Sequence, residues 1–185
     1  MAILGVDEVG RGAWAGPLVV GAVVLAGPVD GLADSKLLTK KRREELNKVI
    51  LSSGAAVGLG WVPASEIDEI GLGAALRLAT RRAVEQIEAP YHEIIIDGTV
   101  NFLADTAKGK YVTTLKKADQ LIAAVSAASI VAKVARDAYM VELDSQHSGY
   151  GFANHVGYGT AAHRAALAKL GPCAEHRLSF RPVSA

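Results

Sequence analysis

Two short apolar runs in this chain each end in acidic residues, and this pattern constrains the fold more than any other feature. The first run, Ile3-Leu4-Gly5-Val6, is followed directly by Asp7 and Glu8. The second run, within HEIIIDG at residues 92–98, ends at Asp97. Apolar runs of this length are typical of buried strands. If the two strands lie side by side, their terminal acids converge at one edge of a sheet.

Converging carboxylates would repel each other by several kcal/mol at short range unless cations share the site. Oxygen ligands select hard ions, Mg²⁺ or Mn²⁺. Two such ions roughly 3.5–4 Å apart form a clamp for attack on a phosphodiester. Asp119 is a further candidate, although it begins a predicted helix, where N-capping is the simpler interpretation. An isolated Asp-Glu pair is also typical of a strand that runs into a solvated turn.

Neighbouring residues on a strand point to opposite faces, so Asp7 and Glu8 should not both reach one face. We therefore expect Asp7 to be central and Glu8 peripheral. Gly10-Arg11-Gly12 follows, and its two glycines free the backbone around one cation, which suggests an anionic substrate beside the metal. A dinucleotide site is disfavoured, because the third glycine is missing and a strand follows, not a helix.

The order of elements predicts a mixed α/β fold. Residues 1–185 form one domain in this interpretation, with a helical C-terminal lobe over approximately residues 146–185. Thr39, Ser65 and Thr160 are predicted helix N-caps. The expected strands are Ile3–Val6, Leu18–Ala26, Ala55–Val62, His92–Asp97 and Lys110–Leu115, and the expected helices are Lys40–Leu51, a short helix after Ser65, Gly73–Glu88, Gln120–Ser145 and Ala161–Leu170.

Composition supports a globular protein and names no partner by itself. Of 185 residues, 50% are hydrophobic and 21% charged, and the net charge is +1. Basic residues gather in the last forty positions and in the first turn of the helix from Lys40, which opposes the helix dipole. Such groups either face a polyanion or are solvated surface.

The chain has one cysteine, Cys173, which excludes an intramolecular disulfide and a cysteine-based zinc cluster. We expect it to be a small packed residue. No signal peptide or membrane-spanning stretch is evident. We therefore expect a cytoplasmic protein that does not contact a membrane. The oligomeric state is a separate expectation, a monomer.

The motifs DEVGRG, DSK, IDG, KAD followed by VSAASIVAKVARD, GYGF, HVGYGT and HRLSF occur in this order from Gly5 to Val183. Together they resemble the ribonuclease HII family, type 2 ribonucleases H. The resemblance implies an RNase H-like mixed sheet flanked by helices, with a helical C-terminal extension. It implies a metal-dependent endonuclease, using Mg²⁺ or Mn²⁺, that cleaves the RNA strand of RNA–DNA hybrids. It also implies cutting 5′ of single ribonucleotides embedded in duplex DNA, leaving 3′-hydroxyl and 5′-phosphate ends.

The resemblance also assigns roles to residues. It makes four acids the catalytic, metal-binding carboxylates, and it places the backbone of the Gly-Arg-Gly turn at the ribose 2′-hydroxyl and flanking phosphate. It places a tyrosine on the deoxyribose after the ribonucleotide, and it suggests two lysines for phosphate contacts. The residues concerned are Asp7, Glu8, Asp97 and Asp119; Gly10, Arg11 and Gly12; Tyr158; and Lys36 and Lys133.

The sequence departs from the family pattern at Trp14, where a smaller residue is usual, and at Leu37, where a polar residue is common. Neither replaces a carboxylate. Two alternatives remain: a non-catalytic nucleic-acid-binding module on the same fold, and a ribonuclease HIII-like enzyme. The latter usually carries an extra N-terminal domain, for which a strand beginning at residue 3 leaves no room. We expect no PCNA-binding tail after the family core.

Other polar and aromatic residues of the C-terminal half have simpler explanations. His155 and His163 could approach the DNA or the metal site, but surface or helix-capping positions are favoured. Asp137 should pair with a cation. Tyr150 and Phe152 should lie in the core of the C-terminal lobe.

Overall fold

Five runs of apolar and β-branched residues form one mixed sheet in the computed structural model, which describes residues 2–32 and 38–184. The strands are β1 (Ile3–Val9), β2 (Leu18–Val24), β3 (Ala56–Val62), β4 (Glu93–Asp97) and β5 (Val112–Leu115). Their order is β3-β2-β1-β4-β5. β1 pairs antiparallel with β2 and parallel with β4, so the carboxyl ends of β1 and β4 meet at one edge.

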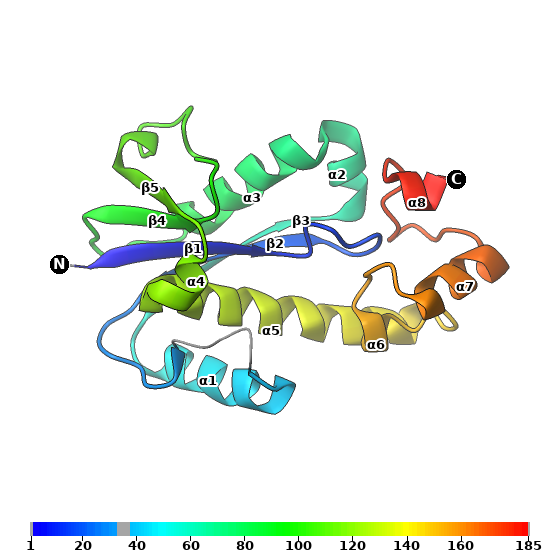
Figure 1. Cartoon of the computed structure of the whole chain (residues 1–185), viewed down its shortest axis with the longest axis horizontal. Coiled ribbons are helices and arrows are strands. Elements are labelled where there is room, and N and C mark those ends of the chain that lie inside the picture. Colours follow the sequence, from blue (N-terminus) through cyan, green and yellow to red (C-terminus); the bar gives the residue numbers. More distant parts are fainter. Residues whose placement is uncertain (1, 33–37, 185) are drawn as a thin grey trace.

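Helices cover both faces of this sheet (Figure 1). α3 packs on one face, and α5 crosses the other face with α1 outside it. The helices are α1 (Lys40–Ser52), α2 (Ala64–Ile70), α3 (Leu72–Glu85), α4 (Ala118–Leu121), α5 (Ala123–Gln146), α6 (Phe152–His155), α7 (Ala161–Leu170) and α8 (Arg181–Ser184), and a 3₁₀ turn, η2, spans Gly109–Tyr111. The predicted α/β fold with a mixed sheet and flanking helices is confirmed.

The core lies on both sides of the central strands. All seven residues of β2 are buried, which explains its nearly continuous apolar sequence. One apolar cluster fills the space between the sheet and α3, and a second lies between β2, α5 and α1. At Gly5 and Gly21 the backbone of α5 comes so close that a Cβ atom would overlap Ala124 or Ala128.

Two local expectations differ from the structure. The helix predicted from Gln120 is interrupted at Ile122, whose extended backbone (φ −122°, ψ 114°) separates α4 from α5. α4 begins after Lys117, which adopts a left-handed conformation (φ 60°), so Asp119 lies inside the first turn and is not the N-cap. Ser65 is not an N-cap either, because α2 already begins at Ala64.

The caps predicted at Thr39 and Thr160 are confirmed. Their hydroxyl oxygens accept hydrogen bonds from the backbone N–H groups of Arg42 and His163, respectively, both at 3.2 Å. Each bond satisfies one of the donors that a helix start leaves without an intrahelical partner.

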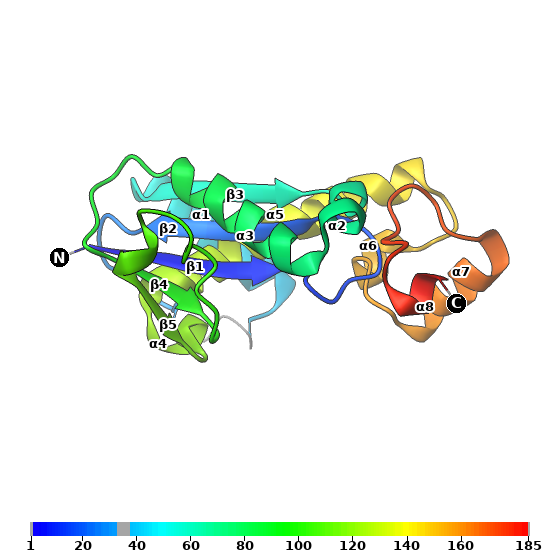
Figure 2. The same ribbon diagram turned by 90° about the horizontal axis from the view of Figure 1, so that it is seen from above.

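The C-terminal segment, residues 147–184, surrounds the end of α5 that projects beyond the sheet (Figure 2). Tyr150 and Phe152 are buried there with Met140 and Leu143 of α5, as predicted. Ala15, from the loop after β1, joins the same cluster, so this loop connects the sheet to the C-terminal segment. Within the two described stretches of chain, no helix is long and apolar enough to cross a membrane.

Candidate active site

Three of the four predicted acids line one open hollow of about 390 Å³. The ladder between β1 and β4 runs from Ile3↔Glu93 to Val6↔Ile96, so Asp7 and Asp97 are the next residue on each strand. Glu8 lies past the end of this ladder and reaches the hollow from its edge. The convergence expected from the two strand ends is therefore present.

Asp7 is the central acid, as expected. Its side chain is buried, and its Oδ1 accepts a hydrogen bond from the backbone N–H of Glu8 (2.9 Å). Burial raises the pKa of Asp7 from 3.8 to about 7, a hydrogen bond from Ser129 opposes this, and the charges of Glu8 and Asp97 add to it. Without a cation in the site, burial and the two neighbouring carboxylates therefore oppose ionisation of Asp7.

Glu8 is peripheral and half-buried, and its Oε1 is 3.4 Å from Nη1 of Arg11. Burial raises the pKa of Glu8, and the charge of Arg11 lowers it. β1 continues to Val9, so the strand does not end at Asp7. Glu8 reaches the hollow because β1 has passed beyond β4 at this point.

Asp97 and Asp119 are linked through the backbone between β4 and α4. Oδ1 of Asp97 accepts a hydrogen bond from the backbone N–H of Ala118 (2.7 Å). Asp119 is fully buried and lines a second hollow, together with Asp30 and Ser126. The structure therefore brings Asp7, Glu8 and Asp97 together, and it places Asp119, the residue after Ala118, in a different hollow.

The donor chemistry of the first hollow fits a hard divalent cation. Carboxylate oxygens are the ligands that Mg²⁺ and Mn²⁺ prefer. Burial first, and then the charges of Glu8 and Asp97, raise the pKa of Asp7, so a cation would favour its charged form. Among residues 2–32 and 38–184, however, no three His, Cys, Asp or Glu side chains are grouped closely enough to enclose an ion. The acids therefore fit a hard cation by their chemistry, while the described side chains do not by themselves enclose one.

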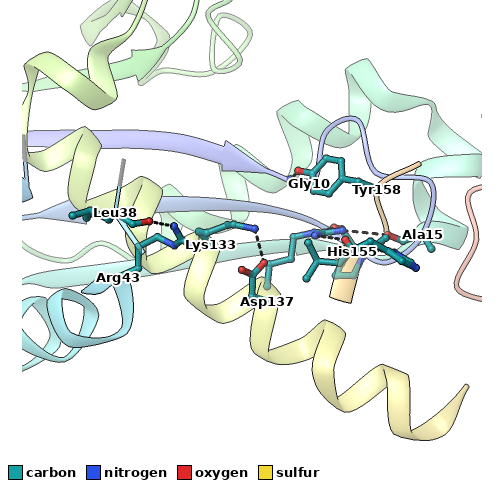
Figure 3. Close-up of polar contacts among 12 residues, drawn as sticks. Gly10, Ala15, Leu38, Arg43, Lys133, Asp137, His155 and Tyr158 are labelled. Carbon is teal, nitrogen blue, oxygen red and sulfur yellow. Dashed lines mark hydrogen bonds and ion pairs between the residues drawn. The ribbon is translucent and has the colours of Figure 1, made fainter. Parts of the chain in front are cut away.

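Two cations, Lys133 and Arg43, line the same hollow. Figure 3 shows the contacts that each of them makes. Lys133, a predicted phosphate contact, extends from α5 and pairs with Asp137 at 2.7 Å, which confirms the cation partner expected for Asp137. Arg43, from the first turn of α1, donates to the carbonyl of Leu38. The basic first turn of this helix was the sequence signal for Arg43. Lys36 lies outside the described residues.

The glycine turn meets Tyr158 although 148 positions separate them. The backbone N–H of Gly10 donates to the hydroxyl of Tyr158 at 3.2 Å (Figure 3). Trp14 N–H donates to the carbonyl of Gly157 at 2.8 Å, which holds the two turns together. Arg11 and Gly12 are exposed beside this contact. The glycine turn and Tyr158 therefore meet, and this contact begins two residues beyond Glu8 in the chain.

Comparison with known proteins identifies the family. The family model described as Ribonuclease HII matches residues 4–183 of the 185-residue chain. The chain belongs to the ribonuclease HII family. Ribonuclease HII of Halorhodospira halophila is 46% identical over 183 residues, covering 98% of this chain and 92% of that protein.

Solved structures of ribonucleases have the same fold as this chain. RNase HII from Archaeoglobus fulgidus, in its complex with PCNA, gives a TM-score of 0.83 at 25% identity, covering 97% of this chain and 95% of that one. Ribonuclease H2 from Pyrococcus horikoshii gives 0.78 at 27% identity, covering 100% and 96%. The chain is therefore a nuclease that hydrolyses phosphodiester bonds, an endoribonuclease of RNA–DNA hybrids. The alternative of a non-catalytic module is set aside.

Two buried arginines of this ribonuclease HII chain were missed in the sequence. Arg136 donates to the carbonyls of Pro17, Val156 and Ala15 at 2.8, 2.8 and 3.2 Å. Arg177 donates twice to the carbonyl of Gly16, at 3.1 and 2.9 Å, and once to that of Arg11, at 3.1 Å. Burial lowers the pKa of Arg177 to about 9. The only sequence signal for Arg136 and Arg177 was their position in the motifs VAKVARD and HRLSF.

The surface position favoured for His155 and His163 is wrong. His155 and His163 are buried, together with His176, and none of the three is at the surface. The rings of His155 and His163 stack with centroids 4.4 Å apart. Burial is possible because backbone groups and a second ring satisfy their nitrogen atoms.

Proposed function

We propose that this protein cuts RNA–DNA hybrids and also duplex DNA that contains single ribonucleotides, on the 5′ side of the ribonucleotide. The observation that carries the proposal is the contact between Gly10 and Tyr158 beside the acids. It puts a backbone that could sense a 2′-hydroxyl against a ring that could pack on the following sugar. Only Val9 separates this contact from Glu8 in the sequence.

In this proposal Asp7 and Asp97 anchor two divalent ions, and Glu8 and Asp119 complete the ligand set. Asp119 lines the second hollow, and it is assigned to the set because it follows Ala118, whose N–H binds Asp97. Ions held by these carboxylates supply Lewis-acid stabilisation of the reacting phosphate and of the leaving 3′-oxygen. The protein's own part is to hold the acids in place. The hydrogen bonds from Glu8 N–H to Asp7 and from Ala118 N–H to Asp97 do this. Both Mg²⁺ and Mn²⁺ suit the donors.

Recognition rests on the other side of the site. The 2′-hydroxyl is the group that distinguishes RNA from DNA at one nucleotide, and glycine backbone allows close approach to it. The backbone of Gly10-Arg11-Gly12 takes that role. Tyr158 packs against the sugar that lacks the hydroxyl. Lys133 contacts a phosphate, and Lys36 is proposed for a second one.

The C-terminal segment from about residue 146 acts as a substrate-binding lobe in this proposal. It carries Tyr158, and Arg136 and Arg177 attach it to the loop after β1. Both arginines are buried cations, so they add positive potential beneath a surface that would face nucleic acid.

The test is cleavage of a labelled DNA duplex with one internal ribonucleotide, in Mg²⁺, in Mn²⁺ and in EDTA. We expect a single cut 5′ of the ribonucleotide, with 3′-hydroxyl and 5′-phosphate ends, in either metal and none in EDTA. The same duplex without the ribonucleotide should stay intact. Cleavage of the all-DNA duplex, or equal cleavage in EDTA, would contradict the proposal.

A further inference from the structure

A line of hydrogen bonds runs through two buried histidine rings beneath Tyr158. The backbone N–H of Cys173 donates to Nδ1 of His176 at 3.0 Å. Nε2 of His176 is 3.1 Å from Nε2 of His163. Nδ1 of His163 is 3.0 Å from the carbonyl oxygen of Tyr158. The line therefore begins at one backbone donor and ends at one backbone acceptor.

The two ends fix where the protons lie. A backbone N–H can only donate, so Nδ1 of His176 accepts and the ring carries its proton on Nε2. A carbonyl can only accept, so His163 carries its proton on Nδ1. Nε2 of His163 is then the acceptor for the Nε2–H of His176. Each ring is neutral and in the opposite tautomer from its neighbour.

His155 is locked in the same way. The backbone N–H of Gly157 donates to its Nδ1 at 3.2 Å, so its proton lies on Nε2, which faces the carbonyl of Tyr150 at 2.8 Å. A second proton on any of these rings would set two donors against each other. Burial also favours the neutral rings, because it lowers the pKa of His163 and brings that of His176 to about 4.

The line ends at a strained turn. Val156 has φ 43° and Gly157 has φ 84°, and the left-handed region is unfavourable for a β-branched residue. Donors from elsewhere hold all three consecutive carbonyls of the turn: Arg136 donates to Val156, Trp14 to Gly157, and His163 to Tyr158. Thr160 N–H also donates to the carbonyl of Tyr158 at 2.8 Å.

We propose that His163 and His176 are positioning residues that hold the Tyr158 ring in place against the Gly10 turn and so set the enzyme's preference for ribonucleotide–DNA junctions. The inference rests on the proposed function, because it takes Tyr158 as the residue that contacts the sugar. Neither histidine touches substrate. They act on the backbone of Tyr158, while Gly10 N–H fixes its hydroxyl from the other end.

A metal site at these histidines is the competing interpretation, and the geometry opposes it. Sγ of Cys173 lies 3.2 Å from Nδ1 of His176, while His163 faces Nε2, on the opposite side of the same ring. One ion could not bind the thiol and both rings. Both ring nitrogens of His176 are also already engaged.

The test compares His163→Phe with Tyr158→Ala. Phenylalanine keeps the ring volume and removes both hydrogen bonds. We expect kcat/KM on a single embedded ribonucleotide to fall about tenfold, as for one lost positioning hydrogen bond, with continuous hybrids within about twofold. His163→Asn, whose amide can still donate to the Tyr158 carbonyl, should restore part of the loss. His147→Phe is the control, the same change at a half-buried histidine outside the line.

The double variant His163→Phe, Tyr158→Ala should lose no more selectivity than Tyr158→Ala alone, because both changes act through one ring. Equal losses on both substrates for His163→Phe, or fully additive losses in the double variant, would overturn the inference. If wild type itself shows no cleavage at embedded ribonucleotides, the proposed function fails instead.

A spectrum tests the line of hydrogen bonds without any substrate. The ¹⁵N shifts of the imidazoles at pH 7 should show His163 protonated on Nδ1, and His176 and His155 on Nε2. His176 protonated on Nδ1, or on both nitrogens, would overturn the inference even if every variant failed to fold.

Discussion

At the scale of single residues, the main feature is charge placed where burial opposes it. Asp7 is 6% exposed and faces two further carboxylates. In the absence of divalent ions this arrangement costs stability, because the folded state must bury a charge that the unfolded chain exposes to water. Bound cations would remove this cost, because they offset the negative charge of the carboxylates.

Asp7→Asn should therefore separate activity from stability. We expect hydrolysis to fall by about a thousandfold or more, since the central ligand is lost. In EDTA at pH 8 the free energy of unfolding should rise, by on the order of 3 kcal/mol, since the charged carboxylate is gone. The pKa of Asp7 is raised in the folded state. The free energy of unfolding of wild type therefore falls as pH rises from about 4 through 7, while that of the variant does not change for this reason.

Urea unfolding at pH 5 and pH 8 checks the stability prediction for Asp7→Asn, with Glu88→Gln at an exposed position as the control. A variant less stable than wild type at pH 8 in EDTA would contradict it, and so would retained turnover in Mg²⁺ or Mn²⁺.

His176 should show the opposite pH dependence. Its pKa is about 4 when folded and near 6.5 when unfolded, so the unfolded chain binds the proton first. The contribution of neutral His176 to the free energy of unfolding is complete above pH 6.5 and is lost as pH falls towards 4. The total loss is about 3 kcal/mol. Carboxylates titrate in the same window, so the measurement is the difference in unfolding free energy between pH 7.5 and 4.5, wild type against His176→Gln. An equal drop in both proteins would argue against a buried neutral ring.

At the scale of elements, the seating of α5 on the sheet decides where the site lies. The sequence of α5 is rich in alanine, and β1 and β2 carry Gly5 and Gly21 beneath it. Small residues on both sides let the helix backbone approach the strands closely. Lys133 and Ser129, on the same helix, consequently reach the hollow that holds the acids.

Gly21→Ala tests this close approach. The added Cβ would overlap the carbonyl of Ala128, and we expect a loss of about 2–3 kcal/mol from overpacking. Gly73→Ala in the first turn of α3 is the matched control, because its Cβ would meet no atom within 4 Å and alanine favours a helix by up to about 1 kcal/mol. Thermal unfolding of both variants measures the difference. Equal melting temperatures would show that α5 is not held against β2.

At the scale of the whole molecule, the loop after β1 connects the acids to the C-terminal segment. Arg136 and Arg177 supply six hydrogen bonds to backbone carbonyls around it, three each. These bonds run from a late helix and a late loop back to residues 11–17 and to Val156. The two arginines thus hold the acids and Tyr158 in one arrangement.

Arg177→Met should lower the free energy of unfolding by about 2–3 kcal/mol, because buried carbonyls of Gly16 and Arg11 lose their donors. It should also reduce cleavage of both substrates. Arg11→Met, at a side chain that is 57% exposed, should leave stability within about 0.5 kcal/mol and weaken only substrate binding. Chemical denaturation and filter binding distinguish the two effects. A stable Arg177→Met protein would show that the loop is held by other contacts.

Local patterns were sufficient for much of the fold. The strand runs, the caps at Thr39 and Thr160, and the acids near the ends of β1 and β4 are all visible in the sequence, because strand period and helix start depend on neighbouring residues. The family motifs, taken in order, identified the enzyme class. The convergence of Asp7 and Asp97 followed from one assumption, that the two strands are neighbours, which the parallel ladder confirms.

Only the tertiary structure decided the surroundings of these residues. It buried His155 and His163, for which the sequence favoured surface or helix-capping positions, placed Asp119 in a second hollow, and gave Arg177 its partner at Gly16, 161 positions away. Burial and hydrogen-bond partners at that separation depend on how layers pack, and no local pattern encodes them. The sequence by itself determined which residues can do the chemistry, and the packing of the C-terminal segment against the β1 loop determined where Tyr158 stands relative to them.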